Sequence, residues 1–488
     1  MAGREGNDIA TESHTEKKES KNFQSPQNDI GISEKVLIAD AAIGFAIEKE
    51  LGPWEAAKAY PNAILWALVM AACVIMEGYD TALLGSFFAY PSFQIKFGKF
   101  VGITPSTPSG YKLTAAWQSG VSQAPNVGGF IGAIINGWLV TAFGQRRVIL
   151  WSLICMMAFI FIPFFAPNLI VLTIGEFLLG FPWATLATCA ISYASEVLPP
   201  SIRTYLTSYT NMCFIIGQLI ADGVLKELSN HTSEWAYRIP FAIQWVWPCF
   251  LIPLVYLAPE SPWYLVRVGR IEEVDKSLRR LQSSKAKIDP KHTLATIIHT
   301  NEFERENHIG TSYWDCVNGE ELRRTEIACM AFTGAVLCGI NFAYNSSYFF
   351  QSIGVSTSTT YSLSLGGLTV GQLSWAYPAE IGSTRLRQKT ICIARDVHGV
   401  VNIISGILQQ YFMNPEAWNV KGYVGFVWGG TCFLMIIWSY FRLPETWNRP
   451  YEELDILFAQ KTPARKFSAT KVYPIEDNFT AQVAKQEA

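Results

Sequence analysis

The chain has 488 residues, of which 50% are hydrophobic and only 16% are charged, and its formal net charge is −2. Soluble domains carry about 25% charged residues, so the composition excludes an ordinary soluble protein and predicts an all-α polytopic membrane protein. No basic block is present, so we expect no nucleic-acid partner. The ten cysteines include no C-x-x-C pair, and we expect buried thiols rather than disulfides or a metal site.

The N-terminal region, residues 1–60, is polar and charged, and we expect it to be cytosolic and largely disordered, without a cleavable signal peptide. The first apolar segment, 63–87, contains two acids, Glu77 and Asp80. Their spacing of three places them on one side of a helix. An acid in a spanning helix costs about 2.5–3.5 kcal/mol, so it usually faces protein or water. The acids indicate a proton-binding or cation-binding site, or else a solvated position near the outer interface.

Nine further apolar segments follow, and each is long enough or nearly long enough to span a bilayer as a helix. They are residues 114–140, 148–166, 168–194, 205–226, 240–258, 327–347, 361–379, 390–411 and 423–442. The first of these nine is rich in Gly, Ala and Ser, including Gly128 and Gly132, which predicts close approach of helix backbones in the membrane. Arginines follow the second, fourth, sixth and eighth segments, so the positive-inside rule places these loops and both termini in the cytosol. The loop 89–112 disagrees, because it is placed outside yet has three lysines and no acid.

The long polar loop after the sixth segment divides the chain into six segments before it and four after it. Residues 270–283 carry apolar side chains at helical spacing with charges between them, which predicts an amphipathic helix on the cytosolic surface. Asn230 begins an Asn-His-Thr glycosylation motif on the outer side. The expected regions are 1–60, a first bundle 61–258, a cytosolic linker 259–325, a second bundle 326–443 and a cytosolic tail 444–488.

Short polar motifs occur at the cytosolic ends of several segments. They are Gly137–Arg147, Tyr193–Arg203, Pro259–Leu265, Pro378–Arg387 and Pro444–Thr446. In this order they resemble the sugar porter family of the major facilitator superfamily. The runs Met76–Thr81, Gly217–Ile220 and Ser383–Lys389 are similar to its fungal maltose and alpha-glucoside permease branch. The resemblance covers about residues 60–458 and implies a major facilitator fold, with bundles of six spans and an incomplete four joined by a cytosolic helical loop.

Charged residues at these cytosolic ends are candidates for a gate. Glu196 with Arg203, and Glu380 with Arg385 or Arg387, can form ion pairs worth about 0–1 kcal/mol, weak enough for a gate that opens and closes. Simple anchoring by the positive-inside rule is the alternative, and it explains the arginines but not the glutamates. The predicted gate residues are Arg146, Arg147, Glu196, Arg203, Glu260, Glu380, Arg385 and Arg387.

The second half is shorter than the six spans that the family resemblance implies. A seventh-span-like end at Gly354 is followed almost at once by 368–380, which looks like the end of a tenth span. At roughly 20 residues per span, about 60 residues are missing. A missed exon in the gene model and a real deletion are both compatible with the sequence. A real deletion would be expected to impair or abolish transport.

The resemblance also locates a proton-coupling site and a sugar site. Glu176 stands where many sugar porters have an arginine that partners the first-span aspartate, and Arg395 is an alternative cation for Asp80. The predicted proton-coupling residues are Asp80, Glu77 and Arg395. A pyranose needs amide partners and an aromatic face. The candidates are Asn211, Gln218, Asn341, Trp375 and Asn402, each amide having a helix–helix hydrogen bond as its alternative.

We therefore expect proton-coupled uptake of alpha-glucosides such as maltose, or of hexoses, by alternating access. The expected partners are a small sugar and the lipid bilayer, with a monomer in the plasma membrane and no cofactor besides the proton gradient. A non-transporting sugar sensor or an inactive shortened paralogue is the alternative, and the short second half favours it. No catalytic triad, metal-ligand cluster or phosphate loop is recognisable in the sequence, so an enzyme is not expected.

Overall fold

The structure is a computed structural model, and it describes the greater part of the chain. The described ranges are 39–44, 51–103, 109–228, 233–283, 289–306, 313–319, 321–341, 386–414, 423–446 and 451–467, with a few single residues outside these ranges. These residues are almost all helical. The exception is a short antiparallel hairpin of β1 (Lys99–Phe100) and β2 (Tyr111–Lys112). Within the described ranges, seven helices are long and apolar enough to cross a membrane.

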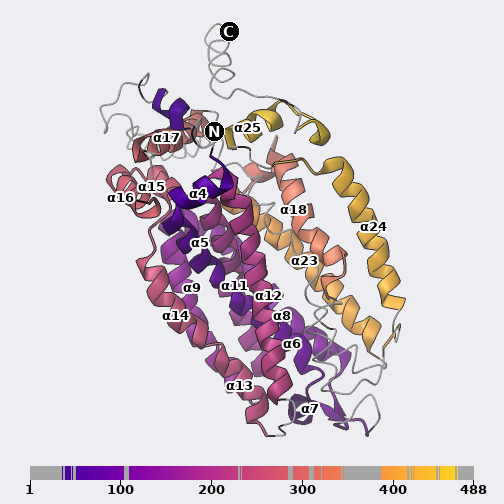
Figure 1. Cartoon of the computed structure of the whole chain (residues 1–488). Coiled ribbons are helices and arrows are strands. Elements are labelled where there is room, and N and C mark those ends of the chain that lie inside the picture. The colour runs from indigo at the N-terminus through magenta and orange to yellow at the C-terminus, as the bar shows by residue number, and fades with distance from the viewer. Residues whose placement is uncertain are drawn as a thin grey trace, which may run out of the picture.

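The first six predicted segments are all helical, and their helices lie side by side as one bundle (Figure 1). The helices are α5 (Pro61–Ala72), α6 (Ile75–Phe87), α8 (Ala115–Phe143), α9 (Gln145–Phe159), α10 (Phe161–Phe164), α11 (Leu169–Val197), α12 (Pro200–Leu228), α13 (Trp235–Ile243) and α14 (Val246–Leu257). Short helices α4 (Pro53–Ala59) and α7 (Pro91–Phe97) lie at opposite ends of this bundle. We call α5 to α14 the N-terminal bundle.

Local sequence explains where these helices begin and how closely they pack. Asn168 caps α11, because its side-chain oxygen accepts the backbone N–H of Val171 at 2.9 Å. The glycines predicted to let helices approach do so: a Cβ at Gly128 of α8 would lie 1.9 Å from the carbonyl oxygen of Phe177 in α11. A Cβ at Gly217 of α12 would likewise lie 1.9 Å from the carbonyl oxygen of Ile75.

The linker, residues 259–325, folds in its described part into helices α15 (Pro262–Arg267), α16 (Ile271–Leu281) and α17 (Pro290–Glu306). The amphipathic prediction for 270–283 matches α16, which buries Val274, Leu278 and Leu281. The linker sits over one end of the N-terminal bundle (Figure 1), where Ser283 donates its backbone N–H to the carbonyl of Ala59 at 2.8 Å.

The described C-terminal part contains η1 (Asp315–Val317), α18 (Glu321–Leu337), α23 (Arg387–Met413), α24 (Val424–Arg442), α25 (Tyr451–Ala459) and η4 (Ala464–Lys466). Three of the four later predicted segments correspond to α18, α23 and α24. The segment 361–379 lies outside the described residues, so the count of four spans and the region boundaries stay predictions.

The hydrophobic core has separate parts within the N-terminal bundle and between the two halves. One large cluster fills the bundle between α5, α9, α11 and α14, and an aromatic cluster around Phe87, Phe93 and Phe241 fills the end that carries α7. A third cluster joins the halves, because Ile191 and Phe214 pack with C-terminal side chains such as Phe332. Among the described helices, the most extensive contact between the halves is where α23 packs along α8 (Figure 1).

Candidate functional site

A cavity lies where the N-terminal bundle meets α18 and α23. Its charged and polar lining comes from both halves of the chain, and aromatic side chains complete the wall. The principal lining residues are Glu77, Gln123, Asn126, Phe130, Trp183, Phe214, Asn341, Asn345, Arg395, His398 and Asn402. The cavity thus combines an aromatic wall with amide donors and acceptors, the two features a sugar ring requires.

An ion pair crosses this cavity between the two halves. The guanidinium of Arg395 on α23 donates to the carboxylate of Glu77 on α6, and their side chains are 15% and 9% exposed. Because a charge buried without its partner is strongly unfavourable, each group holds the other in place. The pair therefore fixes α6 against α23.

A chain of side-chain amides crosses the cavity beside the ion pair. Asn341, next to α18, donates to Asn402 of α23 at 2.9 Å, and Asn402 donates to Asn126 of α8 at 3.1 Å. Asn126 in turn donates to Gln123 at 2.9 Å. These bonds are between neutral groups, so each is worth about 0.5–1.5 kcal/mol and can be exchanged for a ligand hydroxyl.

Two of these amides, Gln123 and Asn126, were missing from the sequence prediction. They lie three residues apart on α8, a helix that contains no charged residue over its 29 positions. Polar side chains at helical spacing in such a span face protein rather than lipid. That spacing was the available signal.

The other predicted sugar-contacting residues lie elsewhere. Asn211 and Gln218 are buried on α12, at 5% and 1% exposure, and neither is among the residues lining the cavity. Trp375 falls outside the described residues. The structure therefore brings Asn341 and Asn402 together, and the part that any of these residues plays in binding sugar stays a prediction.

Asp80 lies away from the cavity, inside the N-terminal bundle. It is fully buried, and the side-chain amide of Gln244, between α13 and α14, donates to its carboxyl group. The carboxyl group of Glu176 on α11 also reaches it. The expectation that Arg395 serves Asp80 was therefore wrong, since the structure pairs Arg395 with Glu77. Residues three apart on a helix differ by about 60° in direction, enough to face different neighbours.

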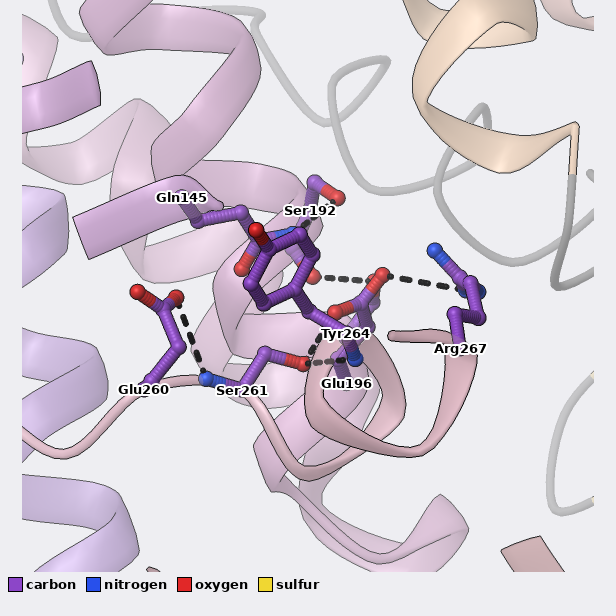
Figure 2. Close-up of polar contacts among 8 residues, drawn as sticks. Gln145, Ser192, Glu196, Glu260, Ser261, Tyr264 and Arg267 are labelled. Atoms are coloured by element: carbon purple, nitrogen blue, oxygen red, sulfur yellow. Dashed lines mark hydrogen bonds and ion pairs between the residues drawn. The ribbon is translucent and has the colours of Figure 1, made fainter. Parts of the chain in front are cut away.

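Glu196 of α11 is held by the linker, at the end of the N-terminal bundle that the linker covers (Figure 2). It accepts the hydroxyl of Ser261 and forms an ion pair with Arg267 at 3.6 Å. Arg203 is buried nearby on α12. Arg267 was not predicted, because its place beside Glu196 depends on how the linker folds back onto the bundle.

A second acid caps the start of α9. One carboxyl oxygen of Glu260 accepts the backbone N–H groups of Arg146 and Ser261, at 3.2 and 3.3 Å. Burial raises the pKa of this carboxyl, and the two N–H groups oppose that shift. Arg146 also donates to the carbonyl of Tyr256, whereas Arg147 is exposed. These described contacts join the N-terminal bundle to the linker.

Besides Trp375, four predicted residues cannot be placed. Glu380, Arg385 and Asn230 lie outside the described residues, and Arg387 is described only as the first residue of α23, without its side chain. The second half of the predicted gate and the glycosylation site therefore stay predictions.

Known proteins resemble this chain over most of its length. The maltose permease MAL61 of Saccharomyces cerevisiae is 35% identical over 490 aligned positions, which cover 86% of this chain and 79% of that protein. The general alpha-glucoside permease of the same yeast is 33% identical over 524 positions, covering 92% of this chain and 83% of the permease.

The fold matches solved structures as well. The proton:xylose symporter XylE, a major facilitator superfamily protein solved with 6-bromo-6-deoxy-D-glucose, superimposes with a TM-score of 0.65 at 18% identity, over 81% of this chain and 98% of XylE. The inward-open form of XylE from E. coli gives 0.57 at 16% identity, over 80% and 98%. The sequence model described as "Sugar (and other) transporter" matches residues 66–370 and 363–458. The chain is thus a multi-span membrane protein with the major facilitator fold, and it belongs to the sugar transporter family.

Proposed function

We propose that this protein takes up alpha-glucosides such as maltose, or hexoses, together with protons across the plasma membrane. The observation that carries the proposal is the cavity between the halves, lined by amides from both and bridged by the ion pair of Glu77 and Arg395. The relatives named as maltose and alpha-glucoside permeases support the choice of sugar.

The geometry supports alternating access. The two halves rock about the cavity, as in other transporters built from paired bundles. In the described arrangement the halves are joined through amide–amide hydrogen bonds, so an entering sugar finds donors and acceptors that its hydroxyls can take over. The proton binds at a buried acid of the N-terminal bundle, and its neutralisation allows the loaded protein to reorient.

The shortened second half bears on whether the transport cycle can be completed. Since 86% of 488 residues is about 420, the 490 positions aligned with the maltose permease include about 70 that have no residue in this chain. The two stretches matched by the family model meet at 363–370, where the sequence places the missing segment. Both observations support an internal shortening of the chain.

Uptake in a yeast strain that lacks its own sugar carriers tests the proposal. The full chain should accumulate radiolabelled maltose or glucose, and more so at pH 5 than at pH 7, because protons drive entry. No uptake of either sugar by protein that has reached the plasma membrane would overturn the proposal and favour the non-transporting alternative. Transcript sequencing across 363–370 shows whether the shortening is real.

A further inference from the structure

Two buried acids face each other inside the N-terminal bundle, apart from the cavity. Asp80 of α6 and Glu176 of α11 both have 0% exposure, and their carboxyl groups lie close enough to interact electrostatically. Asp80 lies seven residues from the end of α6 and Glu176 seven residues from the start of α11. Because the two helices run in opposite directions, the acids lie at the same depth, roughly 10 Å from the helix ends.

Hydrogen-bond donors at this pair are few. The amide of Gln244 donates to one oxygen of Asp80. Within the described part of the chain, the second oxygen of Asp80, both oxygens of Glu176 and the oxygen of Gln244 are buried without a hydrogen-bond donor. Ionised carboxyl groups only accept hydrogen bonds, and an unsatisfied buried acceptor is costly. A proton placed between the two carboxyl groups supplies the missing donor.

The neighbouring helices supply no charge to balance two carboxylates. Helices α5, α8 and α14 contain no charged residue. On α12, Asp222 accepts a hydrogen bond from the hydroxyl of Ser86. The other charged residues of this helix lie at its ends, with Arg203 in the first turn and Lys226 and Glu227 in the last. Arg238 of α13 is paired with Glu234 at 3.0 Å, and Arg146 and Arg147 lie in the first turn of α9. The hydroxyl of Tyr79 is also engaged, because it donates to the carbonyl of Pro240.

The described ion pairs include neither Asp80 nor Glu176, and Arg395 is engaged by Glu77. We propose that Asp80 and Glu176 form one proton-binding site that holds a single proton between their carboxyl groups, and that Glu77 serves as the link between the halves. Binding converts one carboxylate into a carboxylic acid, and release reverses this, with no other bond changed. A calcium or magnesium ion would require about six or more oxygen ligands, more than this site offers. The inference rests on the proposed proton-coupled uptake.

Transport assays on the full chain in proteoliposomes test Glu176 directly. Maltose-driven proton entry, followed with a trapped pH dye, should fall at least tenfold in Asp80→Asn and in Glu176→Gln, with a smaller loss of maltose exchange. The double variant should resemble each single variant, because either change destroys the same site. Asp222→Asn, a buried acid of the same bundle outside the pair, is the matched control and should couple like the original chain.

The outcomes separate the two proposals. Coupled transport that is unchanged in Glu176→Gln overturns the shared site and leaves the proposed function standing. Maltose exchange without proton entry in the original chain overturns proton coupling itself. Uptake that requires sodium rather than choline in the buffer overturns the proton in favour of a metal cation.

Infrared spectroscopy tests the shared proton of Asp80 and Glu176 even if the protein does not transport maltose. Infrared spectra of the reconstituted protein at neutral pH should show the carbonyl stretch of a protonated carboxylic acid. That band should lose intensity in Asp80→Asn and in Glu176→Gln, because a lone acid beside two amides can ionise, and it should change less in Asp222→Asn. A band that is equally strong in Glu176→Gln would overturn the proposal.

Discussion

Glu77 and Asp80 lie one turn apart on α6, yet they meet opposite surroundings. Glu77 faces the other half of the protein and pairs with the guanidinium of Arg395. Asp80 faces its own bundle and meets an amide and a second acid. In our proposal, acids of similar chemistry on one helix are thus divided between holding two halves together and binding a proton. The group that each carboxyl contacts, rather than the carboxyl itself, distinguishes the two roles.

Of the changes considered, removal of the guanidinium of Arg395 should have the largest effect on stability and transport. In Arg395→Leu, Glu77 stays buried without a partner, and breaking such a pair costs about 3–5 kcal/mol. We expect a lower melting temperature in detergent and no measurable sugar uptake. Glu77→Gln combined with Arg395→Gln should recover the melting temperature without recovering uptake. A single variant as stable and active as the original chain would contradict a linking role for the pair.

The helix that carries both acids depends on its close contact with α12. Gly217→Val would push α12 away from the backbone of α6 near Ile75, and overpacking of this kind costs about 1–3 kcal/mol. Both acids should move, so accumulation and exchange should fall together, as measured by uptake and counterflow. Gly223→Val is the control, because a Cβ at Gly223 meets nothing within 4 Å. Equal losses in the two variants would argue against the contact.

The amide chain offers a weaker, exchangeable link between the halves. Asn402→Ala removes bonds worth about 1 kcal/mol, so the KM for sugar should rise roughly fivefold. Gln409→Ala is the matched control on the same helix, because Gln409 accepts a bond from Trp428 within the C-terminal part. It should lower stability and leave KM unchanged. Identical KM values in both variants would remove Asn402 from the sugar site.

Glu260 is a third buried acid to compare with Glu77 and Asp80, and its carboxyl group accepts hydrogen bonds from backbone N–H groups. Its pKa is raised in the folded state, so the folded protein binds a proton more readily than the unfolded chain, and stability falls as pH rises through the folded pKa. Glu260→Gln keeps an accepting oxygen and removes the buried charge. We expect a slightly higher melting temperature than the original at pH 7, and no difference near pH 4. A lower melting temperature at pH 7 would show that the charge is needed.

The sequence was sufficient for the fold class, the family and the helices. Apolar length predicted the spans that the structure describes, because polar groups are costly in lipid, whereas the orientation inferred from the arginines stays a prediction. The glycines of α8 predicted close packing, and Gly128 confirms it.

Side-chain partners were harder to predict. The spacing of Glu77 and Asp80 fixed their angular relation to about 60°, but not the helix that each one faces. Arg395 was therefore assigned to the wrong acid, and Arg267 was missed because the linker had to fold first. Glu176 was noted only as a departure from a family pattern. Its contact with Asp80 requires two antiparallel helices in a register that no local pattern specifies.

The two sides of α8 have different mechanical consequences. Its glycine side is pressed against α11 so closely that a single methyl group at Gly128 would collide with the opposing backbone, whereas its amide side touches α23 through bonds that water or sugar can replace. The glycine side of the helix is therefore fixed by tight packing, whereas the amide side forms a contact along which α23 can move. Substitutions on the glycine side should reduce the amount of folded protein, and those on the amide side should change the rate of transport by each molecule.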